Sequence, residues 1–300
     1  MPETIGYIGL GNMGLPMARN LLRAGYPVVA YDIVGEKVDA LAGEGALAAA
    51  SPAEVARQAA IIFTSLPTTE SLEEVVKGED GILAGCSRGQ IFIDTSTVPP
   101  PLSLHLSELL AERGVATLDA PVSGGSEGSE QGILSIMVGG SAAAFERCLP
   151  LFRVLGSEIN HFGDNVGAGG YAKLANQIMV AMHLAGLAEA VAFAAKAGLD
   201  LNRLLPALGA GRAGSEVLKV NAAAVLARKF DPVGAMGPLR LLHKDLQSVV
   251  DTMEEMGVTG SMIRQILGMY QELVDQGKSE IDCMALLYPY EKIYGVEARG

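Results

Sequence analysis

Cysteine is scarce in this sequence, with three residues among 300. They are odd in number and lie far apart, at positions 86, 148 and 283. This spacing gives neither a disulfide framework nor a Cys-x-x-Cys metal site. We therefore expect a reducing compartment, no bound metal, and thiols that lie buried or half-buried in the protein.

Basic residues are also few. The chain has 22 lysines and arginines against 34 aspartates and glutamates, a formal net charge of −12 at pH 7. A nucleic-acid-binding protein needs a basic face to meet phosphates, and docking on an anionic membrane needs basic residues as well. The charge balance argues against both kinds of partner. Hydrophobic residues make up 49% of the chain, so the sequence predicts a large buried core.

Targeting and membrane segments are a third absence. Residues 1–4 are acidic and lack the basic segment with which signal and transit peptides begin. The sequence therefore predicts a cytoplasmic protein without either kind of peptide. One stretch, 178–195, is apolar over nearly the length of a membrane span. It contains His183 and Glu189, and Lys196 follows it. Because a charge inside lipid is costly, we expect a helix buried in protein on nearly all sides.

The first half of the sequence alternates between strand and helix patterns. Short apolar runs predict strands at 4–10, 27–31, 60–65, 90–94, 115–118, 134–138 and 158–162. Helical spacing predicts helices at 12–24, 52–58, 69–76, 101–113 and 142–151. This order is typical of a parallel, doubly wound sheet. The later patterns are all helical, at 170–197, 202–208, 215–227, 239–256, 261–276 and 284–296. We expect an α/β domain over 1–163 and an all-helical domain over 164–300.

A glycine-rich loop closes the first predicted strand and opens the first helix. It consists of Gly9, Leu10, Gly11, Asn12, Met13 and Gly14. Such a G-x-G-x-x-G loop turns tightly, lets the backbone approach a pyrophosphate, and presents a helix N-terminus to the anion. Asp32 ends the second strand, where a carboxylate binds a ribose 2′-hydroxyl and repels a 2′-phosphate. The residues predict a Rossmann-like dinucleotide-binding domain that favours NAD over NADP.

Three further loops follow strands at the edge of the predicted sheet where ligands bind. Their candidate residues are Leu66 and Pro67 in the first, Thr97 in the second, and Ser123, Gly124 and Gly125 in the third. The N–H groups of the third loop, with the serine hydroxyl, offer a concave site for a carboxylate. Ordinary turn chemistry explains these loops about equally well.

The long predicted helix starts with polar residues on one face. Lys173, Asn176 and Gln177 are spaced i, i+3 and i+4, so they share that face. There the lysine can donate a proton while the amides orient a substrate. Lys244 lies off the apolar stripe of its own helix and faces solvent or a cleft. A lysine in either position is more often a solvated surface charge, and that alternative stays open.

Four motifs occur in the order and spacing found in the β-hydroxyacid dehydrogenases, and the sequence resembles that family over essentially its whole length. The motifs are GLGNMGLPMARNLLRAG at 9–25, DAPVSGG at 119–125, GAGGYAKLANQ at 167–177 and HKDL at 243–246. Within the family the sequence is most similar to the reductases of 2-hydroxy-3-oxopropionate (tartronate semialdehyde). The 3-hydroxyisobutyrate dehydrogenases are near relatives.

The resemblance implies an NAD(P)-dependent oxidoreductase that interconverts a short β-hydroxyacid and its semialdehyde. It implies that Lys173 is the catalytic acid-base residue. Imine-reducing relatives and non-catalytic relatives replace this lysine, which argues against both of those alternatives here.

The resemblance also assigns the ligand contacts. Ser123, Gly124 and Gly125 would hold the substrate carboxylate, and Thr97 and Lys244 would contact the cofactor near its nicotinamide. One of the two amides at 176 and 177 would assist with the substrate. Many members carry Asn where this chain has glutamine at 177, so the choice between these amides stays open.

The length and composition of the long helix also predict assembly. At 1.5 Å per residue it reaches ~40 Å. A helix that is apolar on nearly every face must be buried on all sides. A helical domain of the size of 164–300 is too small to enclose it easily. We therefore expect a homodimer or homotetramer in which a second subunit covers the helix.

Overall fold

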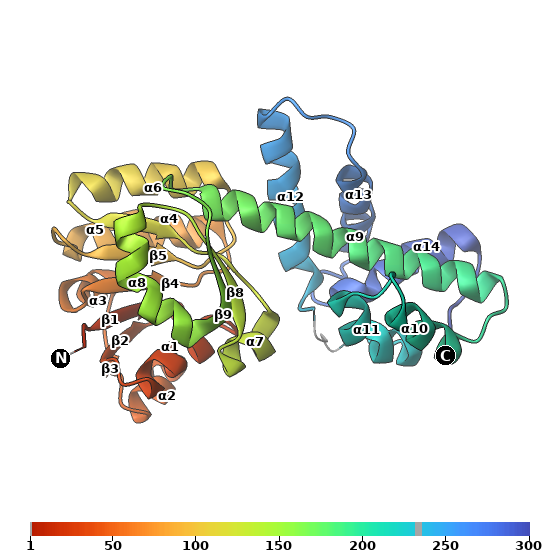
Figure 1. The fold of residues 1–300 in the computed structure, drawn as a ribbon, viewed down its shortest axis with the longest axis horizontal. Coiled ribbons are helices and arrows are strands. Elements are labelled where there is room, and N and C mark those ends of the chain that lie inside the picture. The colour runs from red at the N-terminus through yellow and green to blue at the C-terminus, as the bar shows by residue number, and fades with distance from the viewer. Residues whose placement is uncertain (1, 232–235) are drawn as a thin grey trace. The chain divides into compact units, whose positions relative to one another are not determined.

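The computed structural model describes residues 2–231 and 236–300. The chain divides into two compact units, one ending at Lys173 and the other running from Leu174 to Gly300. The division falls inside one long helix, α9 (Ala168–Lys196), which Figure 1 shows in green. The sequence patterns place the change from mixed to helical structure near residue 163, shortly before this helix begins.

The first unit is built on a six-stranded parallel sheet with the strand order β3-β2-β1-β4-β5-β6. The strands are β1 (Ile5–Ile8), β2 (Val28–Tyr31), β3 (Leu47–Ala48), β4 (Ile61–Thr64), β5 (Ile91–Asp94) and β6 (Ala116–Asp119). The strand order changes direction between β1 and β4. In sheets of this kind the ligand site lies outside the carboxyl ends of the strands at that point.

Helices cover both faces of this sheet, as Figure 1 shows. One face packs against α1 (Gly14–Arg23), α2 (Gly35–Gly43) and α8 (Ala142–Leu155). The other packs against α3 (Pro52–Gln58), α4 (Thr69–Lys77), α5 (Ile82–Gly85) and α6 (Pro100–Glu112). Neighbouring strand residues such as Tyr7 and Ile8 point into opposite clusters, and both are buried. Parallel strands with two covered faces read as continuous apolar runs for this reason.

Two predicted strands belong to a separate sheet, so their placement in the main sheet was wrong. β8 (Leu134–Val138) pairs in parallel with β9 (Gly156–His161), and β7 (Val122–Ser123) is antiparallel to β8. Buried and half-buried residues alternate along β8, and β9 is largely exposed. Each strand therefore has only one covered face, which suits a small side sheet and not the centre of a two-sided one.

The structure confirms the doubly wound α/β domain followed by helices, but several short elements lacked a signal in the sequence. These are α2, β3, α5, β7 and α7 (Gly125–Gln131), none longer than nine residues. The α7 segment contains two glycines and no apolar periodicity, so its sequence indicates only a loop. Short helices of this kind are stabilised by tertiary contacts more than by their own propensity.

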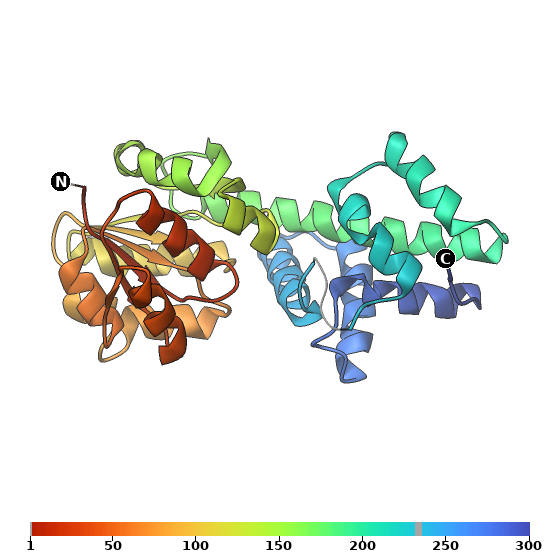
Figure 2. The ribbon, with the colours of Figure 1, turned by 90° about the horizontal axis from the view of Figure 1, so that it is seen from below.

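The second unit is helical, and its helices pack against the C-terminal part of α9 (Figure 2). Its elements are α10 (Leu201–Ala210), α11 (Glu216–Ala227), α12 (Leu239–Glu255), α13 (Met262–Asp275), the 3₁₀ helix η1 (Cys283–Leu286) and α14 (Leu287–Tyr294). One hydrophobic cluster joins them, with Leu184 and Ala188 of α9 fully buried in it. The all-helical expectation for this half is confirmed.

Within a single chain, α9 is buried on one side only. Met179 and Phe193 are 55% and 58% exposed, while the residues on the opposite side enter the core. By length and composition alone the helix is also long and apolar enough to cross a membrane. The predicted burial on nearly all sides is therefore not reached inside one chain.

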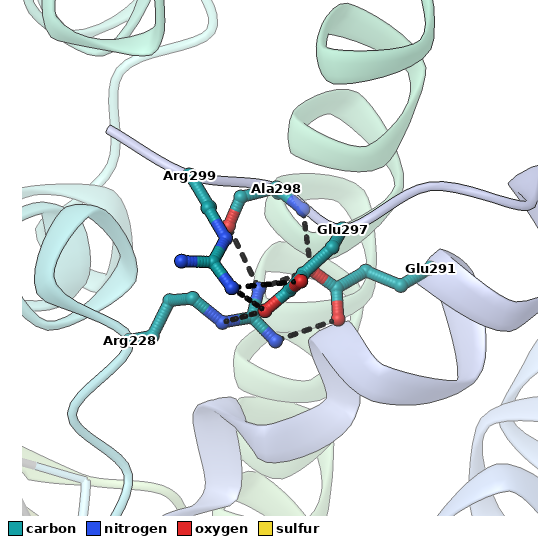
Figure 3. Close-up of polar contacts among 5 residues, drawn as sticks. All are labelled: Arg228, Glu291, Glu297, Ala298 and Arg299. Atoms are coloured by element: carbon teal, nitrogen blue, oxygen red, sulfur yellow. Dashed lines mark hydrogen bonds and ion pairs between the residues drawn. The ribbon is translucent and has the colours of Figure 1, made fainter.

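A cluster of charged groups fastens the C-terminal residues to the end of α11 (Figure 3). Arg228 ends that helix at φ 50, a left-handed conformation in which glycine is preferred. Its guanidinium binds both carboxylate oxygens of Glu291, with Nη2 3.0 Å from Oε2, and donates to the Ala298 carbonyl at 2.7 Å. The Ala298 N–H in turn donates to Glu291 Oε1 at 2.6 Å. These side-chain contacts offset the backbone strain at Arg228.

We expect Glu291→Gln to lower the free energy of unfolding by roughly 1–3 kcal/mol, because it removes the buried carboxylate paired with the partly buried Arg228 guanidinium and leaves only the more exposed Glu297, at 3.4 Å, as a counter-charge. Urea denaturation followed by circular dichroism measures this. Glu216→Gln is the matched control, since the ion pair of Glu216 with Lys219 is largely exposed and worth about 0–1 kcal/mol. Equal, small losses in the two variants would contradict the assignment.

Candidate active site

The glycine loop between β1 and α1 has two closely packed glycines and one open one. A Cβ atom at Gly9 would lie 2.4 Å from the Ser65 carbonyl oxygen, and one at Gly14 would lie 1.9 Å from the Gly9 carbonyl oxygen. Gly9 also has φ 91, which favours glycine. At Gly11 a Cβ would meet nothing within 4 Å. The backbone at Gly11 therefore faces open space into which a phosphate can approach.

The start of α1 fits an anion. Among the residues that the structure describes, no side chain caps the first turn of this helix. Its N–H groups and the positive end of the helix dipole are therefore suited to a phosphate. Together with the open space at Gly11, this fits the pyrophosphate of a dinucleotide. Within the loop, Asn12 is exposed and Met13 is half-buried.

Asp32 lies just beyond β2 and holds the glycine loop in place. Its Oδ2 accepts a hydrogen bond from Leu10 N at 2.6 Å, and its Oδ1 accepts one from Val34 N at 2.8 Å. Lys37 Nζ lies 3.8 Å from Oδ1, and the Ile33 side chain is 89% exposed. Asp32 therefore stabilises the glycine loop through its hydrogen bond to Leu10, and it is also the carboxylate expected at the end of the second strand. Lys37 lies beside it.

A buried carboxylate connects the loops that follow β4 and β5. Asp94 Oδ1 accepts from Thr64 Oγ1 at 2.7 Å and from Ser96 Oγ at 2.6 Å. Ser96 Oγ accepts in turn from Leu66 N at 2.9 Å. The loop that carries Leu66 is thereby fixed to the loop that carries Thr97, which is half-buried. Pro67 follows Leu66 and is exposed.

The loop with the predicted carboxylate site begins in β7 and turns into α7. Gly124 and Gly125 have φ values of 139 and 65, which glycine adopts without strain. Both are exposed, and Ser123 is half-buried. Two successive residues with positive φ leave their N–H groups accessible, which is compatible with a concave anion site.

Two contacts between α7 and α1 join this loop to the glycine loop. The buried Ser129 donates from Oγ to the Met13 carbonyl at 2.8 Å. Asn20 of α1 donates from Nδ2 to the Ser129 carbonyl, also at 2.8 Å. The helix that follows the predicted substrate loop is thus fixed to the helix that follows the predicted cofactor loop. Nothing in the sequence marks either residue, since their partners lie more than 100 positions away.

Asp119, at the end of β6, holds the start of α9. Its Oδ1 accepts from Gly167 N at 2.8 Å and its Oδ2 from Gly170 N at 2.6 Å. Burial raises the pKa of this carboxyl to about 6; the backbone N–H groups act in the opposite direction, and the nearby Asp94 adds to the rise. Lys173 follows within one turn of the helix and is 7% exposed. It is therefore a buried lysine and not a solvated surface charge.

In the second unit a chain of polar contacts connects α9 with α12. Asn176 Nδ2 donates to Gln177 Oε1 at 2.9 Å, and Gln177 Nε2 donates to Asp245 Oδ2 at 2.5 Å. Lys244 Nζ lies 3.0 Å from the other carboxylate oxygen of Asp245. The sequence patterns predict both amides and Lys244 as site residues but do not single out Asp245, whose only signal is its place in the HKDL motif. Across residues 2–231 and 236–300, no cluster of three metal-binding side chains occurs.

Two family models match the chain. One, described as the NAD binding domain of 6-phosphogluconate dehydrogenase, matches residues 4–163. The other, described as NAD-binding of NADP-dependent 3-hydroxyisobutyrate dehydrogenase, matches residues 167–290. The chain belongs to the NAD(P)-dependent β-hydroxyacid dehydrogenases. This confirms the family and the class of enzyme predicted from the four motifs.

Full-length relatives of this dehydrogenase carry different substrate names. It is 38% identical to 2-hydroxy-3-oxopropionate reductase of Escherichia coli, over 96% of this chain and 97% of that protein. It is 36% identical to 2-(hydroxymethyl)glutarate dehydrogenase of Eubacterium barkeri, over 99% and 97%. The crystal structure of 3-hydroxyisobutyrate dehydrogenase from Salmonella typhimurium matches with a TM-score of 0.86 at 28% identity, over 96% of this chain and 99% of that one. Family membership therefore leaves the substrate open.

Proposed function

We propose that this dehydrogenase interconverts 2-hydroxy-3-oxopropionate (tartronate semialdehyde) and its β-hydroxyacid with NAD(H). The observation that carries the proposal is the buried Lys173, which follows the carboxyl edge of a dinucleotide-binding sheet. The 38% identity to the Escherichia coli reductase supports the choice of substrate. A short substrate of the 3-hydroxyisobutyrate type is the second candidate, because the match to that solved dehydrogenase extends over nearly the whole of both chains.

In the proposed reaction Lys173 moves the proton on the substrate oxygen. A bound nicotinamide dinucleotide supplies the hydride that the aldehyde carbon receives. Lys173 in its ammonium form donates a proton from Nζ as negative charge develops on the carbonyl oxygen. In the reverse direction neutral Lys173 removes the hydroxyl proton. Because the side chain is almost entirely buried, water has little access to this proton.

We assign the substrate carboxylate to Ser123, Gly124 and Gly125. The two glycines present accessible N–H groups, and the serine hydroxyl adds a donor. A carboxylate bound there is stabilised by backbone dipoles without a positively charged side chain. This also fits a chain with few basic residues.

We assign Asn176, in preference to Gln177, as the amide that assists in binding the substrate. Both ends of the Gln177 amide are engaged, since Oε1 accepts from Asn176 and Nε2 donates to Asp245. Gln177 therefore holds Asn176 in position. Thr97 and Lys244 are assigned to the cofactor near its nicotinamide, and the ion pair with Asp245 restricts the position of Lys244 Nζ.

Lys173→Ala should lower kcat at least ~10²-fold, the usual scale for the loss of a general acid. The assay is oxidation of NADH with tartronate semialdehyde, and NADH affinity measured by fluorescence should stay near that of the wild type. Lys196→Ala is the matched control, because Lys196 is an exposed lysine in the last turn of the same helix. Normal turnover in Lys173→Ala would exclude the catalytic role.

Asp32 is expected to make NAD(H) the preferred cofactor. Asp32→Asn combined with Ile33→Arg should raise the ratio of kcat/KM for NADPH over NADH at least tenfold, because the repulsion is removed and a phosphate partner is added. Ile33→Arg alone keeps the hydrogen bond from Leu10 to Asp32 and should give a smaller change. If the wild type already prefers NADPH, the neighbouring Lys37 outweighs Asp32 and the assignment is wrong.

We also propose that the enzyme is a homodimer or homotetramer in which a second copy covers the exposed side of α9. Tyr171, Met179 and Phe193 are exposed large apolar side chains on that side, and a Cβ at Gly186 would meet nothing within 4 Å. Light scattering of active enzyme should give a multiple of 31.2 kDa. A mass of one chain would refute the assembly. A cytoplasmic location without nucleic-acid or membrane partners stays a prediction.

A further inference from the structure

We propose that Asp119 is a positioning residue for Lys173: its carboxylate binds the backbone at the start of α9 and so fixes the turn of helix that carries the lysine. The inference rests on the proposed function, in which Lys173 moves the substrate proton. Asp119 is not assigned any contact with substrate or cofactor.

The two carboxylate oxygens of Asp119 accept from two separate backbone N–H groups, one just before α9 and one in its first turn. Gly167 lies just before the helix and Gly170 lies in its first turn, at 2.8 Å and 2.6 Å from the oxygens. Two bonds to one rigid carboxylate restrict both the position of the helix end and its rotation. Lys173 is three residues beyond Gly170, so its Cα position follows directly from this contact.

Two glycines near Asp119, Gly139 and Gly169, are packed so closely that neither position has room for a side chain. A Cβ at Gly139 would lie 2.4 Å from Asp119 Oδ1. One at Gly169 would lie 2.3 Å from the Met137 carbonyl oxygen and 2.6 Å from that of Asp119. The glycines at 167–170 therefore allow the backbone to pack closely against the Asp119 carboxylate. They serve this close packing and do not form a flexible link.

Asp119 also stands beside the other parts of the candidate site. It pairs in register with Asp94 on the adjacent strand, and Asp94 fixes the loops that carry Leu66 and Thr97. Ser123 follows Asp119 in the same short segment. The end of β6 thus leads along the chain into the substrate loop, and its last side chain, Asp119, holds the start of α9.

The ionised form of Asp119 costs stability, which argues for a role in the site. Burial raises its pKa to about 6, above the ordinary value. A carboxyl whose folded-state pKa is raised contributes most stability at low pH, and that contribution is lost as the pH rises through about 6. At neutral pH the protein therefore carries a buried negative charge at this position, a cost that an apolar side chain would not have. Such costly buried charges are typical of functional sites.

A simple helix cap would make the same two hydrogen bonds. A cap changes the amount of folded protein, whereas a positioning residue changes the turnover of protein that is fully folded. Measurements on folded enzyme therefore separate the two roles.

The decisive variant is Asp119→Asn in the full-length protein. It keeps the size of the side chain but turns an amide NH₂ toward one backbone N–H, so one of the two bonds is lost. With tartronate semialdehyde and NADH, kcat should fall about 10–100-fold, the scale of a displacement near 1 Å. The KM for the semialdehyde and the affinity for NADH should change less than about twofold.

Asp164→Asn is the matched control. Asp164 lies shortly before the start of α9 and accepts from Ala142 N at 2.8 Å, so the same substitution removes a charge that binds another helix start. Its kcat should stay that of the wild type. Hydrogen–deuterium exchange should become faster at residues 167–170 in Asp119→Asn and stay unchanged there in Asp164→Asn.

The outcomes distinguish the proposals. Unchanged kcat in folded Asp119→Asn, with or without faster exchange, overturns the positioning role while the proposed function stands. A wild type that turns over no short semialdehyde with either cofactor overturns both. If Asp119→Asn does not fold, Gly169→Ala replaces it, since its Cβ would lie 2.3 Å from the Met137 carbonyl oxygen and must displace the start of α9 while the carboxylate stays. A kcat within twofold of wild type in folded Gly169→Ala also overturns the inference.

Discussion

Carboxylates at the ends of parallel strands set the geometry of the first unit. Asp32, Asp94 and Asp119 follow or end three strands of one sheet and accept hydrogen bonds from the glycine loop, Thr64 and the start of α9. An anion removed from water must find such donors, so each carboxylate draws a distant segment to the strand end. All strands of the sheet are parallel, so these ends share one edge. The loops there are consequently held by the sheet itself.

Local patterns made much of this arrangement predictable. The strand and helix alternation, the glycine loop and Asp32 each depend on residues close together in the sequence, and α3 (Pro52–Gln58) has the same bounds in sequence and structure. The bracing contacts are different in kind. Asp94 meets Thr64 across 30 positions and Ser129 meets Met13 across 116, and a single sequence carries no record of such pairs. The strands of the small sheet are not separable from those of the main sheet in the sequence, because a short apolar run does not distinguish one covered face from two.

In the second unit, the side chain of Gln177 links α9 to α12. Gln177 is one methylene longer than the asparagine common at this place in the family, and its amide reaches Asp245 on α12. Its oxygen then receives the Asn176 amide. The glutamine at this position thus has a physical account in a chain of polar contacts that runs from Asn176 through Gln177 to Asp245.

The two units differ in when their defining contacts become available to a growing chain. Every partner of the Asp119 carboxylate lies before residue 171, so the first unit can close around it while the rest of the protein is still being synthesised. At the left-handed end of α11, the side-chain partners of Arg228 among the described residues all come later in the sequence. Arg228 must wait for Glu291 and Ala298, some 60 to 70 residues later. On the ribosome, the nucleotide-binding half is therefore complete first, and the helical half gains its last stabilising contacts only after nearly all of its chain has emerged.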